Sequence, residues 1–182
     1  MKKLVIAALA AASLSYGAFA GTQEGVDAFS TEKFDEALKQ FEPAAKEGDS
    51  KALYYLGLMY SGGFGIEKDL KKSLDYYGEA AKKGNVLAQK EYGTALAIGD
   101  GAEQNVDEGL KWLFIAARAG HAGARATATQ FARYMRNTKI IGARRAAIEW
   151  QKEFDAKNGI VRDGNAYLPE RPASKRRRKD NR

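Results

Sequence analysis

The same nine-residue pattern occurs three times in this sequence, and each copy begins 36 residues after the previous one. The copies are AAKEGDSKA (44–52), AAKKGNVLA (80–88) and AARAGHAGA (116–124), with no insertion between them. Leucines keep the same spacing, at Leu38, Leu74 and Leu110. A fixed period of this size is typical of repeat proteins, in which each unit buries its apolar face against its neighbours. The period therefore predicts a stacked array rather than a single globular core.

Each repeat predicts two helices joined by a glycine turn. Ala52, Leu56 and Tyr60 recur four residues apart, which places them on one apolar stripe of a helix. Gly63 and Gly65 then permit the positive φ angles of a tight turn. A second helix is predicted over 69–83, with four residues facing inward: Leu70, Leu74, Tyr77 and Ala81. We therefore predict an all-α fold, an α-solenoid of six or seven helices in antiparallel pairs that form a right-handed superhelix.

The single histidine, His121, lies where a predicted helix begins. The equivalent residues of the other copies are Asp49 and Asn85, whose side chains are good acceptors for the free backbone amides of a helix N-terminus. His121 has no helical Glu or His partner at metal-binding spacing and no serine arrangement beside it. We therefore interpret it as a capping residue, and we predict no catalytic residue, no metal site and no cofactor.

Two segments are specific enough to resemble a known family. Residues 52–85, ALYYLGLMYSGGFGIEKDLKKSLDYYGEAAKKGN, resemble a Sel1-like repeat, a bacterial relative of the tetratricopeptide repeat, and residues 88–121 resemble it nearly as well. The resemblance implies a scaffold for protein complexes, with no catalytic residues shared by the family. It also implies exported relatives that act in envelope assembly, motility, secretion and host interaction. The units are expected at about 29–48 (a leading half-repeat), 49–84, 85–120 and 121–159 (a diverged cap), within a solenoid spanning 21–160.

The third copy departs from the pattern of the first two. Thr129 stands where Gly57 and Gly93 stand, Ala132 replaces Tyr60, and the glycine turn is missing from MRNTKII (135–141). Its second helix is predicted over 143–159. A diverged last unit is typical of a solenoid cap, because its outer face meets water.

The N-terminus has the features of a secretory signal peptide over residues 1–20. Lys2 and Lys3 precede an apolar run over 4–14, and the small residues AFA (18–20) offer a cleavage site. The alternative is a membrane anchor, but the run is shorter than the roughly 20 residues that a spanning helix needs. We expect export to the periplasm, or secretion. With no cysteine in the chain, a disulfide framework and thiol chemistry are both ruled out.

The net charge of +7 is concentrated in two segments. Residues 21–168 hold 21 acids and 21 bases, whereas residues 169–182 hold seven bases and two acids. Within the body, residues 111–148 hold eight bases and no acid. We predict a disordered basic tail over 161–182, with a cluster at Lys175, Arg176, Arg177, Arg178 and Lys179. The tail is either a solubilising segment or a tether to anionic lipid, lipopolysaccharide or an acidic protein. Nucleic acid is not expected in an exported chain.

The sequence favours a non-catalytic scaffold that binds a protein or peptide in the groove of the solenoid. No small-molecule substrate is evident, because the chain has one histidine, no cysteine and no glycine-rich phosphate loop after a strand. The expected binding residues lie on the first helix of each pair, opposite the packed stripe: Lys51, Tyr54, Leu58, Lys90, Thr94, Gln130 and Arg133. Two alternatives stay open. Tyr54 and Leu58 could instead pack on neighbouring helices, and the protein could instead bind an anionic surface or polymer through its tail and third repeat.

Overall fold

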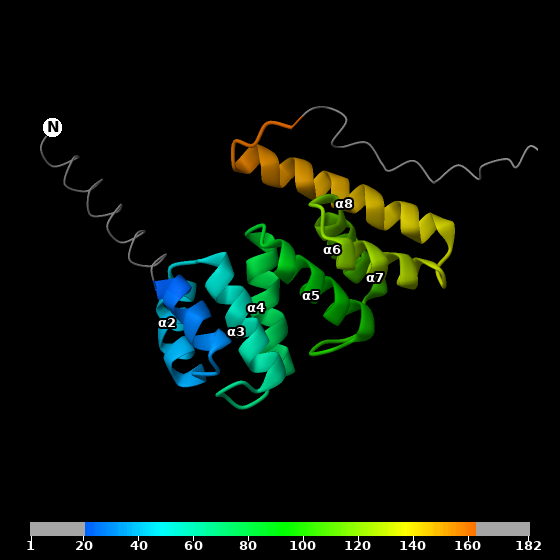
Figure 1. Ribbon diagram of the computed structural model, residues 1–182. Helices are drawn as coiled ribbons and strands as arrows, with labels where there is room; N and C mark the ends of the chain where they lie inside the picture. The colour runs from blue at the N-terminus through cyan, green and yellow to red at the C-terminus, as the bar shows by residue number, and fades with distance from the viewer. Residues whose placement is uncertain (1–20, 163–182) are drawn as a thin grey trace, which may run out of the picture.

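The computed structural model describes residues 21–162, which fold into helices and turns without a strand. Residues 21–30 are helical, and the helices that follow are α2 (Phe34–Lys46), α3 (Ser50–Gly62), α4 (Leu70–Lys82), α5 (Val86–Ile98), α6 (Val106–Arg118), α7 (Ala122–Ala132) and α8 (Asn137–Lys157) (Figure 1). Each helix from α2 to α6 packs against the next one in the chain, as in a solenoid. The prediction of an all-α solenoid is confirmed. The expected signal peptide and most of the basic tail lie outside the described residues.

The leading unit is a pair of helices rather than a half-repeat, which brings the described helices to eight instead of six or seven. Residues 21–30 pack against α2 and α3 through aromatic rings. A Cβ atom on Gly25 would lie 2.6 Å from the Phe41 ring, and the Phe29 ring lies edge-on to Tyr55 with 5.4 Å between centroids. The sequence pattern missed this helix because it precedes the first copy of the repeated motif.

The junctions between repeats are capped as the sequence predicts. The turn that follows the second helix of each pair contains a glycine in the left-handed conformation: Gly48 (φ 87°), Gly84 (φ 89°) and Gly120 (φ 96°). The residue after each glycine then accepts a hydrogen bond from the backbone N–H three residues on: Asp49 from Ala52 at 3.0 Å, Asn85 from Ala88 at 3.0 Å, and His121 from Ala124 at 3.1 Å. The prediction that His121 caps a helix is confirmed.

This geometry makes a prediction about His121. Since its Nδ1 accepts a hydrogen bond, the neutral ring carries its proton on Nε2. His121→Ala should lower the free energy of unfolding by about 1 kcal/mol or less, because it removes the capping acceptor. His121→Asn should cause no loss, because asparagine already caps α5. Urea unfolding followed by circular dichroism measures both variants, and an equal loss in the two would contradict the capping role.

The buried stripe of α3 differs from the prediction at one position. Ala52, Leu56 and Met59 are buried, whereas Tyr60 is half-exposed and stacks on Tyr76 with 5.6 Å between ring centroids. At 3.6 residues per turn, a residue eight positions on has drifted by about 80°, whereas one seven positions on has drifted by only about 20°. Leu70 was also expected to face inward but is half-exposed at the start of α4.

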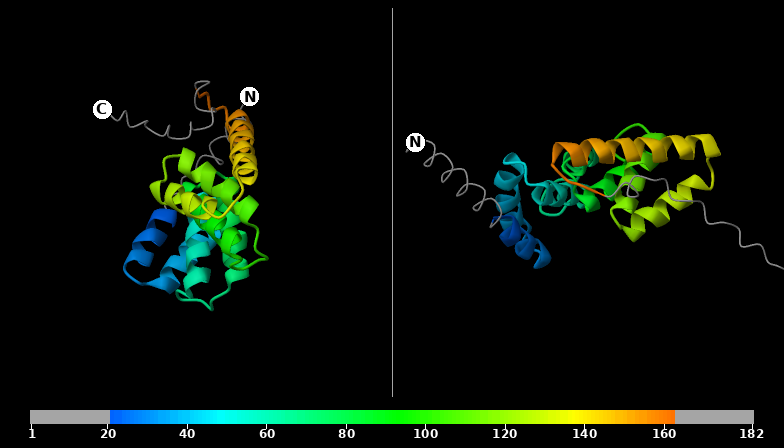
Figure 2. Two further views of the ribbon diagram at one scale, coloured as in Figure 1. Left: turned by 90° about the vertical axis from the view of Figure 1, so that its right-hand side faces the viewer. Right: turned by 90° about the horizontal axis from the view of Figure 1, so that it is seen from above.

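The two helices of the third repeat do not pack against each other as those of the first two repeats do. Helices α7 and α8 both pack against α6, but α8 does not lie along α7, and the two diverge from the turn that joins them (Figure 2). The prediction that the last helix begins at 143 is wrong. With no glycine in residues 137–141, the helix already starts at Asn137 and continues to Lys157.

The third repeat lacks the glycine at which the helices of the first two repeats meet. In the second repeat α5 and α6 cross at Gly93 and Gly109, where a Cβ atom on Gly93 would lie 2.8 Å from the carbonyl oxygen of Gly109. In the first repeat the Tyr77 ring lies against the equivalent Gly57. Thr129 stands at the equivalent position of the third repeat, where it is exposed and its hydroxyl donates a hydrogen bond to the carbonyl oxygen of Arg125.

Candidate functional site

The exposed side of α5 carries a stripe of four residues, which we call the α5 stripe: Leu87, Glu91, Thr94 and Ile98. Its two ends are apolar and open to solvent, with Leu87 47% and Ile98 55% exposed. Ala97 lies 36 residues before the predicted binding residue Arg133, so the repeat places it on the same face, but it is completely buried. The exposed register that starts at Leu87 reaches Ile98 after three full turns. Beside the stripe is a hollow that α3, α4 and α5 line together, with Ser61, Asp100 and three stripe residues on its wall.

Two predicted binding residues, Lys90 and Thr94, are half-buried and engaged within α5 itself. The Lys90 Nζ lies 2.9 Å from a carboxylate oxygen of Glu91. The Thr94 hydroxyl donates a hydrogen bond of 2.8 Å to the carbonyl oxygen of Lys90. These contacts hold Glu91 and Thr94, the polar residues of the α5 stripe, between its two apolar ends.

On α3 the predicted residues divide between surface and core. Lys51 is exposed, and its Nζ donates a hydrogen bond of 3.1 Å to the Gln23 side chain. Tyr54 and Leu58 are half-buried and pack against a core cluster that α4, α5, α6 and α8 share. Burial, together with the Glu91 carboxylate, raises the pKa of Tyr54 to about 12. Its phenol therefore stays protonated at neutral pH, and these two side chains chiefly join α3 to its neighbours.

The remaining predicted residues are exposed, with Gln130 on α7 and Arg133 directly after its last residue. They line a second hollow, together with Ala126 and Tyr134 among others. No residue of this hollow belongs to the hollow beside α5. Of the predicted residues, Thr94 lines the hollow beside α5, and Gln130 and Arg133 line the hollow on α7, so the predicted set does not form one continuous groove. The predicted tail cluster at 175–179 lies beyond the described part of the chain.

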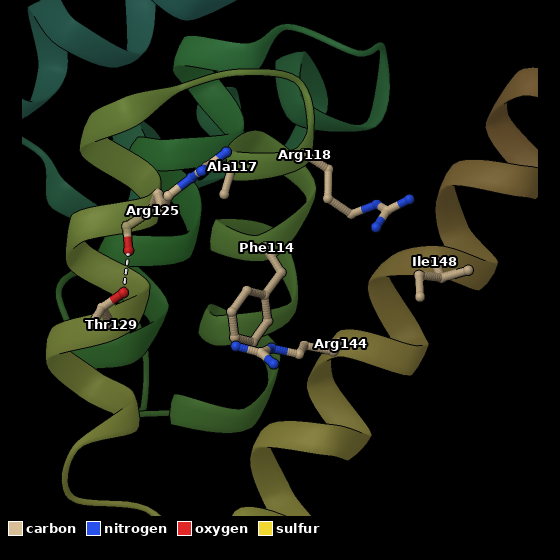
Figure 3. Close-up of a pocket in the computed structure, with 7 residues that line it drawn as sticks. All are labelled: Phe114, Ala117, Arg118, Arg125, Thr129, Arg144 and Ile148. Carbon is tan, nitrogen blue, oxygen red and sulfur yellow. Dashed lines mark hydrogen bonds between the residues drawn. The ribbon is translucent and has the colours of Figure 1, made fainter. Parts of the chain in front are cut away.

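A third concave feature lies between α7 and α8, and the sequence analysis did not name it. We call it the arginine cleft, and its residues are Phe114, Ala117, Arg118, Arg125, Thr129, Arg144 and Ile148 (Figure 3). Its volume is about 60 Å³. The Arg144 guanidinium lies over the Phe114 ring, 5.1 Å from the ring centroid. The signal in the sequence was the acid-free stretch 111–148, which contains every one of these residues.

The described residues show no arrangement typical of an active site. His121 Nδ1 is engaged in its helix cap, and no group of three or more His, Cys, Asp or Glu residues between 21 and 162 could hold a metal ion. The one fully buried carboxylate in this range, Asp155, is held at 2.6 Å by the Nε of Arg162 and is part of the packing of α8. No helix within residues 21–162 is long and apolar enough to cross a membrane.

Stacked helix pairs with glycine-ended, side-chain-capped junctions define an α-solenoid repeat protein. Its repeats are Sel1 repeats: the family model for the Sel1 repeat matches residues 50–85 and 86–121. The chain therefore contains two Sel1 repeats, and the resemblance stated from the sequence is confirmed. Sel1-repeat proteins are generally scaffolds for protein interactions.

Solved structures show the same fold. One is c5321, described as a protective antigen present in uropathogenic Escherichia coli strains and displaying an SLR fold. It has 21% sequence identity and a TM-score of 0.74, over 87% of this chain and 34% of that chain. A Sel1 repeat protein from Oxalobacter formigenes has 26% identity and a TM-score of 0.57, over 65% of this chain and 96% of that chain. This chain thus spans about a third of the length of c5321. No curated protein matches it in sequence.

Proposed function

We propose that the protein is a non-catalytic scaffold that binds a partner protein through the exposed sides of its first helices, α3, α5 and α7. The observation that carries the proposal is the α5 stripe. Two large apolar side chains, Leu87 and Ile98, remain about half exposed there on a helix whose other face is packed. Exposed apolar side chains beside a hollow are typical anchors of protein–protein interfaces.

The place of action that we propose is the bacterial envelope or the secreted milieu. Support comes from the sequence before Gly21, where two lysines, an apolar run and small residues follow one another as in a signal peptide. We propose the periplasm first, with secretion as the alternative.

The proposal predicts a loss of partner capture when the α5 stripe becomes charged. In the double variant Leu87→Glu/Ile98→Glu, two carboxylates replace the apolar anchors, and partner proteins should be recovered at no more than about a tenth of the wild-type level. The measurement is quantitative mass spectrometry of proteins cross-linked to the purified bait in an envelope fraction. Both positions are exposed, so the fold should be kept, as circular dichroism would verify.

The matched control adds the same two charges elsewhere. Ala146 and Ala156 are exposed on α8, and Ala146→Glu/Ala156→Glu should capture the same partners as the wild type. If the α5 variant captures them equally well, the stripe is not the binding surface. If both variants lose them, the added charge and not the location is responsible.

A second candidate is binding to an anionic surface or polymer. Residues 111–148 contain eight bases and no acid, which favours this candidate, and the basic cluster at 175–179 favours it too. Clustered bases near an anionic membrane contribute about 1 kcal/mol each. Sedimentation with phosphatidylglycerol vesicles at low and high salt tests this candidate, because electrostatic binding should weaken as salt rises and should be lost on truncation after Pro169.

A further inference from the structure

The first two repeats differ in sequence at the place where the hollow beside α5 lies. In the first repeat, Phe64 follows the end of α3, and its ring stacks on Phe34 with 5.4 Å between ring centroids. The same ring lies directly against Gly62, where an added Cβ atom would clash with it. The equivalents of these three residues, 36 positions on, all line the hollow: Leu70, Ile98 and Asp100. A carboxylate therefore replaces an aromatic ring at the wall of the hollow.

The hydroxyl groups that line the hollow have already used their hydrogen atoms. Those of Ser61, Ser73 and Thr94 each donate to a backbone carbonyl oxygen, at 3.0, 2.8 and 2.8 Å. The fourth hydroxyl, that of Tyr77, lies 3.3 Å from the Ser61 oxygen and is the donor in that contact, because the Ser61 hydrogen is engaged. These groups can therefore only accept a hydrogen bond from a further partner.

The charged side chains that line the hollow are both carboxylates, Glu91 and Asp100. Glu91 is paired with the Lys90 ammonium, which does not line the hollow itself. The Asp100 carboxylate makes no hydrogen bond and no ion pair within residues 21–162. No lining residue carries a side-chain N–H group. The hollow thus combines an unbalanced negative charge with hydrogen-bond acceptors, and this combination suits a cation with several N–H donors.

We propose that the hollow beside α5 binds the arginine or lysine side chain of a partner segment in which an apolar residue stands beside the base. This inference rests on the proposed scaffold function and names the chemistry of the partner. A guanidinium carries five N–H donors and an ammonium three, and neither accepts a hydrogen bond. The volume of about 190 Å³ is several times the roughly 30 Å³ of a water molecule in the liquid, so the head of one such side chain fits.

The surroundings of the hollow favour a protein segment over a small cation. Ile98 is 55% exposed and belongs both to the wall of the hollow and to the α5 stripe. An apolar side chain that covers Ile98 removes apolar surface from water, which stabilises the complex, whereas a metal ion or a polyamine would leave Ile98 uncovered. Residues 21–110, which include α3, α4 and α5, hold 17 acids and 10 bases, so their field also attracts a basic segment.

The test starts from a random dodecapeptide phage library panned on the full-length protein. The library is first depleted on the variant Asp100→Lys, which removes peptides that bind elsewhere on the molecule. The peptides that remain should share an Arg or Lys next to a large apolar residue. The best of them, labelled with fluorescein, is then titrated by fluorescence anisotropy. A failure to select any peptide, or selected peptides without a base, rejects the proposal.

The variant Asp100→Asn keeps the shape of the side chain and removes its charge. It should weaken peptide binding at least about tenfold, because a charged hydrogen-bonding partner of the base is lost. The matched control is Glu103→Gln, an exposed residue of the same loop that does not line the hollow, and it should leave the affinity unchanged. Both variants should fold, as circular dichroism would verify. Equal weakening by the two substitutions would indicate only a general acidic surface and overturn the proposal.

Two further variants test the two halves of the contact separately. A peptide with Glu in place of its base should bind Asp100→Lys more tightly than it binds the wild type; if it does not, the base does not meet Asp100. Ile98→Ser keeps both carboxylates but removes the apolar contact, and it should weaken the selected peptide at least about fivefold. Unchanged affinity in Ile98→Ser would overturn the recognition of an apolar neighbour.

Other occupants of the hollow give different results. The proposal expects the full-length protein and a protein truncated after Pro169 to bind the peptide equally. Binding at least about tenfold tighter to the truncated protein would assign the hollow to the basic tail of the chain itself. Sedimentation velocity that shows a dimer lost in Asp100→Asn would assign it to a second copy. Either result overturns the proposal.

The recognition of a base and the scaffold function can fail separately. If Leu87→Glu/Ile98→Glu loses envelope partners while Asp100→Asn keeps them, the scaffold function stands and this inference falls. If both variants lose the same partners, both proposals stand. If neither variant loses them, the α5 stripe is not the binding surface for these partners, and the peptide affinity of Asp100→Asn still decides whether the hollow binds a base.

Discussion

Replacing Leu110 with alanine is expected to lower the free energy of unfolding by about 2–5 kcal/mol. The Leu110 side chain is completely buried and belongs to a core cluster built from α6, α7 and α8. Its truncation removes apolar contacts and leaves a cavity between three helices that the neighbouring alanines are too short to fill. Urea unfolding followed by circular dichroism at 222 nm measures the loss.

The matched control for this prediction is Leu87→Ala on α5. Leu87 is 47% exposed, so its truncation should change the stability by no more than about 0.5 kcal/mol. Hydrogen exchange adds a regional measurement, because repeat arrays depend on contacts between neighbouring units. In Leu110→Ala, the amides of α7 and α8 should lose protection before those of α3. A loss below about 0.5 kcal/mol would mean that this cluster does not hold the third repeat.

The second large effect is expected for Gly109→Ala. It should lower the free energy of unfolding, whereas the same substitution normally raises it in a helix interior. Alanine in a helix interior is normally favoured over glycine by about 0.8–1.0 kcal/mol. At Gly109, however, the new Cβ atom would lie 2.6 Å from the carbonyl oxygen of Gly93 and 2.8 Å from the backbone nitrogen of Ala97. The helices must separate, and such overpacking costs about 1–3 kcal/mol.

Gly142→Ala is the control for the same substitution without a clash. Gly142 lies within α8, is exposed, and would have no atom within 4 Å of an added Cβ. It should therefore stabilise the protein by up to about 1 kcal/mol, while Gly109→Ala destabilises it. Urea unfolding measures both. If Gly109→Ala were stabilising as well, the close approach of α5 and α6 would not be a requirement of the repeat.

The sequence predicted the repeated part of the structure well, because each feature there has a local cause. A glycine with positive φ followed by a capping residue recurs at all three junctions, so the boundaries of the helices could be assigned from one motif. The role of His121 followed from its two equivalents. The Gly93 crossing was visible as a conserved spacing between the copies, although the contact with Gly109 was not.

The site was less predictable, because it depends on how helices are placed and not on what each repeat contains. A one-residue difference in register exchanged Ala97 for Ile98 on the exposed side of α5. The arginine cleft arises from the separation of α7 and α8, and no local pattern in either helix reports that separation. Only the charge composition of residues 111–148 pointed to this region.

Helix α8 has a consequence for how such an array could lengthen during evolution. It reaches back across α6, where Trp150 lies against Trp112, and its Phe154 ring covers Gly84 at the turn between α4 and α5. A copied unit added after Lys157 would find a diverging pair of helices instead of a closed one on which to stack. Tandem duplication can therefore extend this architecture from within, by inserting whole 36-residue units at a glycine–cap junction such as Gly84–Asn85, more readily than by adding a unit after α8.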